Sequence, residues 1–507
     1  MMASAVLVAL LTVPIVTAAS CRLARRLRVV ELVNAAGATA TLALAAVVVV
    51  RVAKDGAFEA LHGLLYVDAL SALMIGTVAT VGFAAALVSI GYLRHDLAAG
   101  HVPLGRGGVR WYFLGLHGFV WTMLATVSVD NLGLLWVGVE ATTLASALLV
   151  GFYRTKAALE AAWKYLILCT VGITCALFGV ILTYYAARQG GISASLDWSV
   201  LGREGADLDP ALMRLAFVFV LIGFGTKAGF APLHTWLADA HSQAPSPVSG
   251  LLSAVLLSCA LYGILRFHVL TTSATGSEFS SHLLLAFGLI SVAVAAPFVI
   301  VQRDLKRLLA YSSVEHMGLM AVAFGVGGPL GVTAGLLHLV NHAATKALLF
   351  FAAGDLVQRF GNRRISAIHG ALRVAPLAGW ALLLGVLAIT GVPPFGIFIS
   401  ETALVGAGFQ GEWPAVATVS AVVLLLGVIF AGMLMQALRV SYGAPSGGRV
   451  GAHGVKDAAR FDWRAERTTL LALAPLAIAM VLFGVHVPGG VEHLLEDVSV
   501  VLGPVAQ

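Results

Sequence analysis

Apolar segments of helix length follow one another along almost the whole chain, separated by short polar stretches. A helix needs about 20 mostly apolar residues to cross the hydrocarbon core of a bilayer, so each segment predicts a spanning helix. The expected bounds are 3–20, 29–50, 69–92, 111–128, 131–151, 161–187, 211–239, 247–267, 282–301, 307–326, 331–356, 374–408, 414–438 and 468–486. The pattern therefore predicts an all-α polytopic membrane protein with about 14 transmembrane helices.

Two of these segments, the seventh and the twelfth, are long and interrupted. The seventh breaks at Gly229 and Pro232, and the twelfth breaks at Pro393 and Pro394. Matched helix breaks in two halves of a chain are typical of transporters built from inverted repeats. Five segments lead from one break to the next, and because five is odd, the two units would have opposite topology. The sequence therefore predicts two inverted five-helix repeats with broken helices 7 and 12.

This repeat divides the chain into five parts. We expect an N-terminal three-helix segment at 1–110, a first five-helix repeat at 111–267, a second, inverted five-helix repeat at 282–438, a cytoplasmic loop at 439–467, and a last helix with an outer tail at 468–507. The loop reads as a solvated connector because it is rich in Gly, Ser and Arg. A docking surface for a soluble partner is the alternative interpretation of that loop.

The composition supports a membrane protein. Of 507 residues, 59% are hydrophobic and 11% charged, and the mean hydropathy is +0.94. Soluble domains carry about 25% charged residues, so a soluble fold is excluded. The net charge of +6 does not indicate nucleic-acid binding, because the basic residues lie in alternate loops. The four cysteines form no CxxC pair and predict packing residues rather than a disulfide framework, a zinc site or an iron–sulfur cluster.

Lysine and arginine also predict the orientation, because cytoplasmic loops carry an excess of both residues. About 21 of the 31 lie in one set of alternate loops and about 6 lie on the opposite side. The basic set consists of loops 21–28, 93–110, 152–160, 302–307, 357–373 and 439–467. With 14 spans, both termini would lie outside the cytoplasm. Segment 3–20 is followed rather than preceded by arginines, which favours a retained helix over a signal peptide.

Ionisable residues inside the spans of the first unit indicate an ion pathway. Glu140 is the only ionisable residue in its span, and Lys227 lies directly before the first break. A lysine at the centre of a spanning helix costs about 2.5–3.5 kcal/mol on insertion scales. We expect Glu140 to pair with Lys227 and to shift toward Lys164 at the start of the next span. The alternatives are a structural ion pair and lysines that snorkel to the lipid headgroups.

The second unit has its own polar line. His338, His342 and Lys346 recur every four residues, so they share one helical face. Three ionisable groups facing lipid would be very unfavourable, whereas a hydrated path would suit the near-neutral pKa of histidine. Glu401 follows the second break and would end the line near the outer side. Additional candidates are His234, Lys306, Glu315 and His316, of which the last two are adjacent and would point in different directions. Metal binding by the histidines is not expected, because no third ligand follows.

The sequence contains no motif for an energy source of its own. There is no GxxxxGK[ST] motif, and GFGTKAG follows an apolar span rather than a strand, so nucleotide binding is not indicated. No haem, flavin or iron–sulfur motif occurs either. We therefore expect the chain to conduct ions with energy supplied elsewhere.

Three motifs carry a resemblance to a known superfamily: GTKAGFAPLHTWLADAHSQAPSPVSGLL (225–252), DLKRLLAYSSVEHMGLM (304–320) and HLVNHAATKALLFFAAGDL (338–356). They resemble the antiporter-like membrane subunits of complex I, the Mrp cation/proton antiporters and the membrane-bound hydrogenases, over roughly residues 60–440. The resemblance implies inverted five-helix repeats with broken helices. It also implies pathway roles for Glu140, Lys164, Lys227, the line from His338 through His342 to Lys346, and Glu401.

Two details favour the hydrogenase-4 component F type within this superfamily. SSVEHMG, with Glu315 and His316, is more similar to that type than to complex I, where a glutamine–glycine pair is usual. Complex I relatives often have lysine or histidine in span eight, where this chain has Ser258. This departure would interrupt a chain of lysines, with water or Lys306 bridging the gap.

The resemblance predicts a proton-translocating membrane subunit of a hydrogenase-4-like complex, with no redox centre of its own. It implies soluble hydrogenase-type partner subunits that carry nickel–iron and iron–sulfur centres, together with other membrane subunits in an energy-coupling bacterial membrane. Two alternatives remain: an Mrp-type cation/proton antiporter subunit, and the membrane partner of an inorganic-carbon uptake system.

Overall fold

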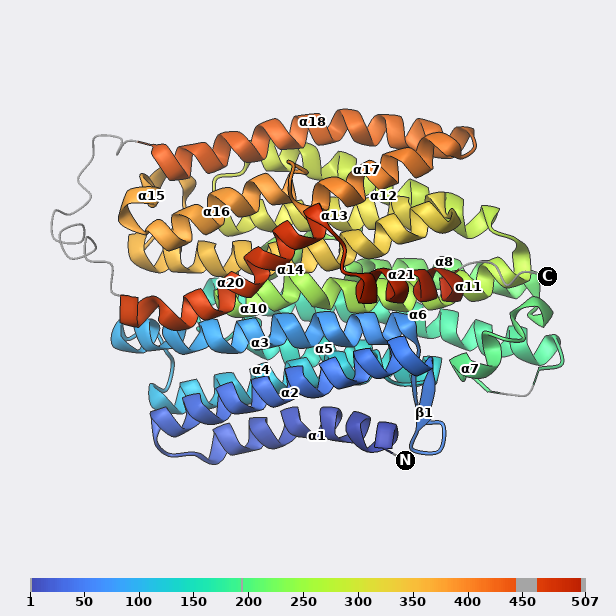
Figure 1. Cartoon of the computed structure of the whole chain (residues 1–507), viewed down its shortest axis with the longest axis horizontal. Helices are drawn as coiled ribbons and strands as arrows, with labels where there is room; N and C mark the ends of the chain where they lie inside the picture. Colours follow the sequence, from blue (N-terminus) through green and yellow to red (C-terminus); the bar gives the residue numbers. More distant parts are fainter. Residues whose placement is uncertain (1, 193–194, 444–462, 503–507) are drawn as a thin grey trace.

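The computed structural model describes residues 2–192, 195–443 and 463–502, most of them in helices that run along one common axis (Figure 1). Within these residues, eleven helices are long and apolar enough to cross a membrane, or twelve if the bent pair near the C-terminus counts as one span. The predicted helical membrane fold is therefore confirmed.

The long elements in chain order are α1 Met2–Leu23, α2 Leu27–Asp55, α3 Ala69–Ala98, α4 Arg106–Thr126, α5 Leu132–Val150, α6 Lys156–Gln189, α8 Pro210–Ala228, α9 Thr235–Gln243, α10 Ser246–Leu251, α11 Leu257–Thr275, α12 Glu278–Val301, α13 Leu305–Val326, α14 Gly328–Phe360, α16 Pro376–Ile389, α17 Gly396–Gln410, α18 Trp413–Tyr442, α20 Trp463–Val485 and α21 Gly489–Leu502. Short pieces join them: a hairpin of β1 Phe58–Ala60 and β2 Leu65–Val67, helices α7 Trp198–Leu201 and α15 Ala371–Val374, and 3₁₀ turns at Gly205–Asp207 and Ile365–Ala367. A π-helical turn at Leu252–Leu256 joins α10 to α11.

The count of spanning helices differs from the expected 14. Helix α4 falls outside the apolar set because Arg106 and Arg110 lie in its first turns. Helices α16 and α17 are each too short to cross a bilayer alone, since they have 14 and 15 residues. The count of 14 requires that α4 and the α16–α17 pair also cross, and it stays a prediction together with the division into repeats.

Both expected breaks separate two helices, and at the first break a side chain satisfies a freed backbone carbonyl. Helix α8 ends at Ala228, and Gly229 adopts the left-handed conformation with φ of 83°. The carbonyl of Thr226 accepts a hydrogen bond of 2.9 Å from the indole nitrogen of Trp236 in α9. At the second break, Gly391 has φ of 67° between α16 and α17. The hydrogen bond from Trp236 lowers the cost of irregular backbone inside an apolar bundle.

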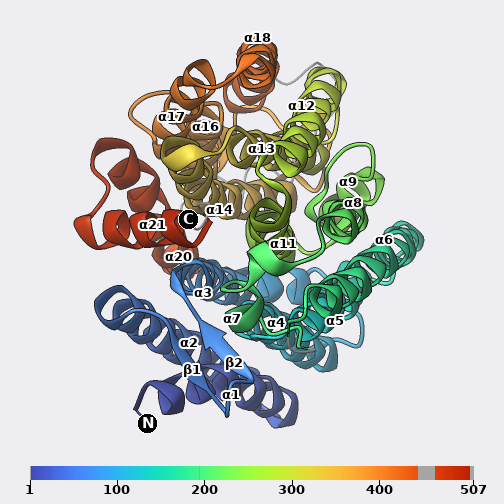
Figure 2. The same ribbon diagram turned by 90° about the vertical axis from the view of Figure 1, so that its right-hand side faces the viewer.

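Helices α11, α13 and α14 form the centre of the bundle, where they are surrounded by the others in the end-on view (Figure 2). Almost every residue in their most apolar windows is buried, whereas the outer helices α1, α2 and α18 bury a third of theirs. The buried ionisable residues of the second unit lie on two of these central helices. Position in the bundle therefore removes those side chains from lipid.

Helices α12 and α13 approach each other through two facing glycines. A Cβ at Gly318 would lie 2.8 Å from the carbonyl oxygen of Gly288, and one at Gly288 would lie 2.7 Å from that of Gly318. Such small residues let membrane helices come into close contact.

We expect Gly318→Val to force these helices apart and to destabilise the chain by about 1–3 kcal/mol, the usual range for overpacking. Unfolding of the purified chain in mixed detergent micelles measures the effect. Gly427 in α18 has open space around its Cα, so Gly427→Ala is the matched control and should be neutral. Equal stability of the two variants would contradict the close packing.

The two ends of the bundle differ in charge. The α1–α2 and α3–α4 connections and α15 lie at one end, which we call the basic end, and the hairpin and α7 lie at the other (Figure 1). The α1–α2 and α3–α4 connections, which belong to the predicted cytoplasmic set, thus lie at the same end. Of the predicted loop 439–467, residues 439–442 are helical in α18 and 463–467 in α20. The remainder of that loop and the predicted docking surface on it lie outside the described residues.

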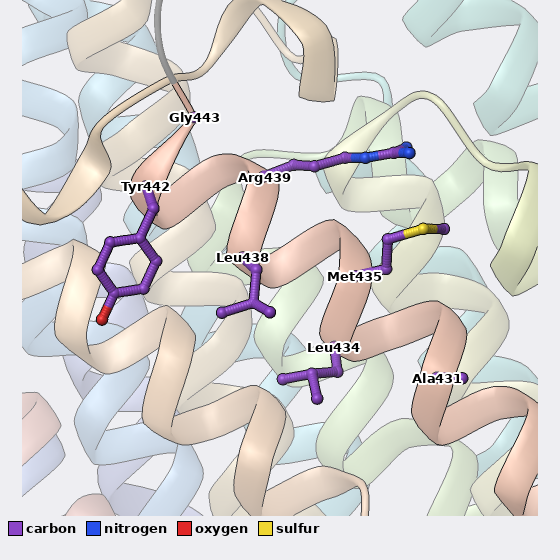
Figure 3. Close-up of a pocket in the computed structure, with 7 residues that line it drawn as sticks. All are labelled: Ala431, Leu434, Met435, Leu438, Arg439, Tyr442 and Gly443. Carbon is purple, nitrogen blue, oxygen red and sulfur yellow. The ribbon is translucent and has the colours of Figure 1, made fainter.

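The outer face of α18 is apolar, as contact with lipid requires. A shallow groove of about 560 Å³ on this helix is lined by Ala431, Leu434, Met435, Leu438, Arg439, Tyr442 and Gly443 (Figure 3). Leu438 and Tyr442 are 42% and 63% exposed, so this face is open in the single chain. The buried ionisable residues do not line this groove.

Candidate functional site

Lys227 is fully buried in the last turn of α8, directly before the first break. Its ammonium donates a hydrogen bond of 2.7 Å to the hydroxyl of Thr143 in α5 and a short one to the hydroxyl of Tyr165 in α6. Tyr165 in turn lies 2.7 Å from the hydroxyl of Ser146. Hydroxyl groups, rather than a carboxylate, therefore contact this buried cation.

Glu140 is half-buried in α5 and lies one step away from Lys227. Its carboxylate accepts a hydrogen bond of 2.9 Å from Thr170 and one of 3.3 Å from Thr143. Because Thr143 also accepts from Lys227, one hydroxyl joins the carboxylate to the ammonium. The expected pair is thus bridged by Thr143, since no direct ion pair joins Glu140 and Lys227 among the described residues.

Lys164 lies at the edge of this arrangement and is half-exposed. Its ammonium pairs with Glu160 at 2.6 Å and with Asp239 at 3.4 Å. Asp239, in α9, also pairs with Arg307 of α13 at 2.6 Å. Asp239 therefore ties α6 to α13, across the predicted boundary between the two units. The sequence analysis did not select Asp239, because the carboxylate lies in a polar stretch after the break and nothing there signals its two cations.

The second unit contains a cluster of three buried histidines, His316, His338 and His342, which we call the histidine cluster. The Nδ1 atom of His316 lies 2.9 Å from Nε2 of His338, whose Nδ1 lies 3.0 Å from the hydroxyl of Ser400. The His316 and His342 rings are 5.5 Å apart. Helices α13 and α14 thus contribute the ring nitrogens of one polar line, and α17 contributes the hydroxyl of Ser400.

Lys346 extends this line and is also fully buried. Its ammonium donates hydrogen bonds of 2.7 Å to Ser312 and 2.9 Å to the carbonyl of Leu309. Glu315 is buried too, with its carboxylate 4.0 Å from His316. Both members of the adjacent pair Glu315 and His316 therefore lie buried inside the chain.

Glu401 lies at the second break. Its carboxylate packs directly against Gly391, where a Cβ would collide with it. One carboxylate oxygen of Glu401, the side-chain amide of Asn341 and both ring nitrogens of His342 are buried without a hydrogen-bond partner in the described part of the chain. Unpartnered polar atoms thus lie close to the second break, and position 391 has room only for glycine.

Ser258 and His241 lie in the region between Lys227 and Lys346, and His241 was not among the residues selected from the sequence. Ser258 is buried, and its hydroxyl donates to the carbonyl of Ala254, 3.2 Å away in the π-helical turn. His241 in α9 is fully buried. Its ring lies 6.1 Å from Trp236 and 5.8 Å from Phe350. The only sequence signal for His241 is a histidine near the end of a broken span.

Lys306 and His234 lie on either side of α9. His234 directly precedes this helix, and its ring lies 6.2 Å from Tyr311. Lys306 in the first turn of α13 donates a hydrogen bond of 2.5 Å to the carbonyl of Ala244, just beyond the C-terminus of α9. Cations stabilise a helix C-terminus through its dipole, so Lys306 caps this short helix.

Arg266 and Asp68 form a buried ion pair that was not predicted from the sequence. Arg266 of α11 donates two hydrogen bonds, of 2.6 and 2.7 Å, to the carboxylate of Asp68, which directly precedes α3. The guanidinium lies 4.4 Å from the ring of Trp198 and 2.9 Å from the hydroxyl of Tyr262. The sequence analysis counted Arg266 among the outer loops because it ends an apolar segment.

Comparison with known proteins places the chain in a family of membrane proteins. Residues 129–427 match the family described as NADH:quinone oxidoreductase/Mrp antiporter, TM. The chain is 39% identical to a hydrogenase-4 component F homolog of Methylacidiphilum infernorum over 438 residues, which cover 86% of this chain and 88% of the relative.

Two solved structures have the same fold. One is a chain of the membrane-bound sulfane sulfur reductase, an archaeal respiratory membrane complex, with a TM-score of 0.83, 24% identity and 98% of each chain covered. The other is a chain of the Mrp complex from a Dietzia species, with a TM-score of 0.81, 21% identity, and 98% of this chain and 97% of that chain covered.

Proposed function

Because the chain belongs to the NADH:quinone oxidoreductase/Mrp antiporter membrane family, we propose that it is the proton-translocating membrane subunit of a hydrogenase-4-like complex. The resemblance inferred from the sequence motifs, including the hydrogenase-4 component F type, is confirmed by this match. The observation that carries the proposal is the series of buried titratable side chains that runs from Lys227 to the histidine cluster, supported by hydroxyls rather than by fixed countercharges.

A proton on one of these groups changes the free energy of protonating the next. Charge interactions are strong where water is scarce, so a charge on Lys227 disfavours a charge on neighbouring cationic sites. Thr143 joins Lys227 to Glu140, and a shift of that hydroxyl would separate the two charges. Their separation is the switch that we propose for the first unit. In the separated state, Glu140 would shift toward Lys164.

The second unit would continue the path. His241 is the group that we place between Lys227 and Lys346, because span eight offers only the hydroxyl of Ser258. Histidine suits this position, since it accepts and releases protons near neutral pH. Unpartnered polar atoms at His342, Asn341 and Glu401 offer hydrogen bonds to water on the way out. Protons would enter from the cytoplasm and leave near Glu401.

Redox chemistry would take place in partner subunits. Among residues 2–192, 195–443 and 463–502, no three His, Cys, Asp or Glu residues are grouped so that they could hold a metal ion. We propose that soluble hydrogenase-type subunits hold the nickel–iron and iron–sulfur centres, and that further membrane subunits pack against this chain. We place the complex in a bacterial energy-coupling membrane, with both termini outside the cytoplasm.

His338→Leu should slow proton transport by about 100-fold or more, the usual effect of removing a proton-transfer group. The change removes the contacts of His338 with His316 and Ser400 while nearly preserving its volume. Proton uptake by inverted membrane vesicles measures the rate. His117 is the matched control, because this histidine is buried in α4, away from the histidine cluster, and contacts Asn34 of α2 at 2.9 Å. Comparable slowing by His117→Leu, with normal assembly, would argue against a special role for the histidine cluster.

Isolation of the tagged chain from native membranes, with its partners identified by mass spectrometry, tests the assigned complex. Nickel–iron hydrogenase and iron–sulfur subunits are the expected partners. Small Mrp-type membrane proteins alone would instead favour the cation/proton antiporter named in the family description. A large zinc-containing soluble protein would favour inorganic-carbon uptake. Either of the last two results would refute the hydrogenase assignment.

A further inference from the structure

A cavity of about 780 Å³ with several polar side chains in its wall opens at the basic end of the bundle, and we call it the α3–α14 cavity. Its walls come from the C-terminal parts of α3 and α14, the α5–α6 connection, the α9–α10 connection and the first turn of α13. Lys306, which is 2% exposed, lines it together with Ser246. The cavity therefore leads from the surface to a buried amine.

The wall of the cavity holds a connected set of proton-exchanging groups. The hydroxyl of Tyr153 donates a hydrogen bond of 2.5 Å to the carboxylate of Asp96, and the hydroxyl of Tyr92 lies 3.0 Å from that of Tyr153. The side-chain amide of Gln358 donates to the other Asp96 oxygen at 2.8 Å. Burial, followed by the neighbouring Tyr92 and Asp96, raises the pKa of Tyr153, so the phenol remains a donor.

Two exposed histidines stand at the rim beside the same carboxylate. The Nδ1 atoms of His95 and His101 lie 3.7 and 3.9 Å from Asp96, and the side chains are 49% and 65% exposed. Imidazoles exchange protons with water near neutral pH. The cavity is thus lined by exposed histidines at its rim, by a buried carboxylate hydrogen-bonded to a tyrosine, and by the buried amine of Lys306.

We propose that the α3–α14 cavity is the entrance through which protons from water at the basic end reach Lys306, with Asp96 as the collecting carboxylate. This entrance rests on the proposed proton transport, and it adds an access route between the two units. Lys306 also caps α9, which carries His241 and Asp239. Its protonation state therefore acts on the helix that connects the two units.

Water access to the cavity floor is tested apart from transport, by cysteine labelling in the whole complex. Lys306→Cys and Ser246→Cys, each with Cys175→Ala to remove the half-buried native thiol, should react with a membrane-impermeant methanethiosulfonate from the basic end. Ser313→Cys is the control, because Ser313 is fully buried on the same helix and contacts Ser253. Labelling at least about tenfold faster than this control is expected. No labelling of either floor position from that side would overturn the entrance.

Transport variants test whether the carboxylate collects protons. Asp96→Asn should slow proton uptake from the basic end by about tenfold or more. Gln358→Met removes one hydrogen bond to Asp96 but leaves the charge of Asp96 unchanged. The rate of proton uptake in this variant should stay within about twofold of the wild-type rate. Equal slowing in both variants, or no slowing in Asp96→Asn, would overturn the role of Asp96. If the wild-type complex moved no protons, the proposed function would fail, and the labelling result would still report access of water.

Discussion

Lys227→Met should abolish proton transport while leaving the chain assembled with its partners. Methionine fills nearly the same space but carries no proton, so the link from Glu140 through Thr143 to the first helix break is lost. Thr143 keeps the carboxylate of Glu140 as a hydrogen-bond partner, and Tyr165 keeps the hydroxyl of Ser146. Loss of a single proton-transfer group slows transfer by about 100-fold to 10,000-fold, which is below the background leak of most vesicles.

Proton uptake by inverted vesicles, normalised to the amount of assembled complex, measures this effect. Lys164→Met is the matched control, because Lys164 is half-exposed and solvent screens its ion pairs with Glu160 and Asp239. We expect a few-fold slowing in that variant. Wild-type rates in Lys227→Met would show that the buried ammonium is not part of the path.

Arg266→Met should destabilise the folded chain by about 3–5 kcal/mol, the cost of leaving a buried charge without its partner. Asp68 would lose both hydrogen bonds from the guanidinium, although the backbone nitrogen of Ser71 would still donate to it. The ring contacts with Trp198 and Tyr262 would be lost as well. Since Asp68 directly precedes α3 and Arg266 lies on the central helix α11, the N-terminal segment would lose a main anchor.

The amount of chain in the membrane and its resistance to heating in detergent measure this loss. The double variant Asp68→Asn with Arg266→Met removes both charges and should recover a large part of the stability. Arg214→Met is a control, because this arginine makes only a ring contact, 5.9 Å from Phe279, among the described interactions. A double variant no more stable than Arg266→Met alone would contradict the view that the unpaired carboxylate causes the damage.

The features predicted from sequence are those with a local signal. The break at Pro232 follows from a proline and a glycine inside an apolar span, and the shared face of His338, His342 and Lys346 follows from their spacing. Both depend on residues close together in the chain, so a periodic pattern reveals them. The structure adds the contact of His316 with this face, which comes from a separate helix.

The features that sequence could not predict depend on contacts between distant segments. Thr143 bridges Glu140 and Lys227, but a threonine in an apolar helix usually bonds its own backbone, so its bridging role has no signal. Arg266 lies 198 residues from Asp68 and resembles a loop arginine at the end of a span. The count of 14 helices, which the apolar pattern predicts, stays a prediction, because the arginines of α4 lower its hydropathy and α16 and α17 are short.

Reconstitution of the purified complex into liposomes tests the central claim most directly. Internal pH is followed with a trapped dye while electron transfer through the partner subunits is measured in the same sample. The account predicts that the internal pH changes in proportion to the electrons transferred, that a protonophore abolishes the change, and that the change does not require sodium. Electron transfer with no movement of protons across the membrane would contradict the account.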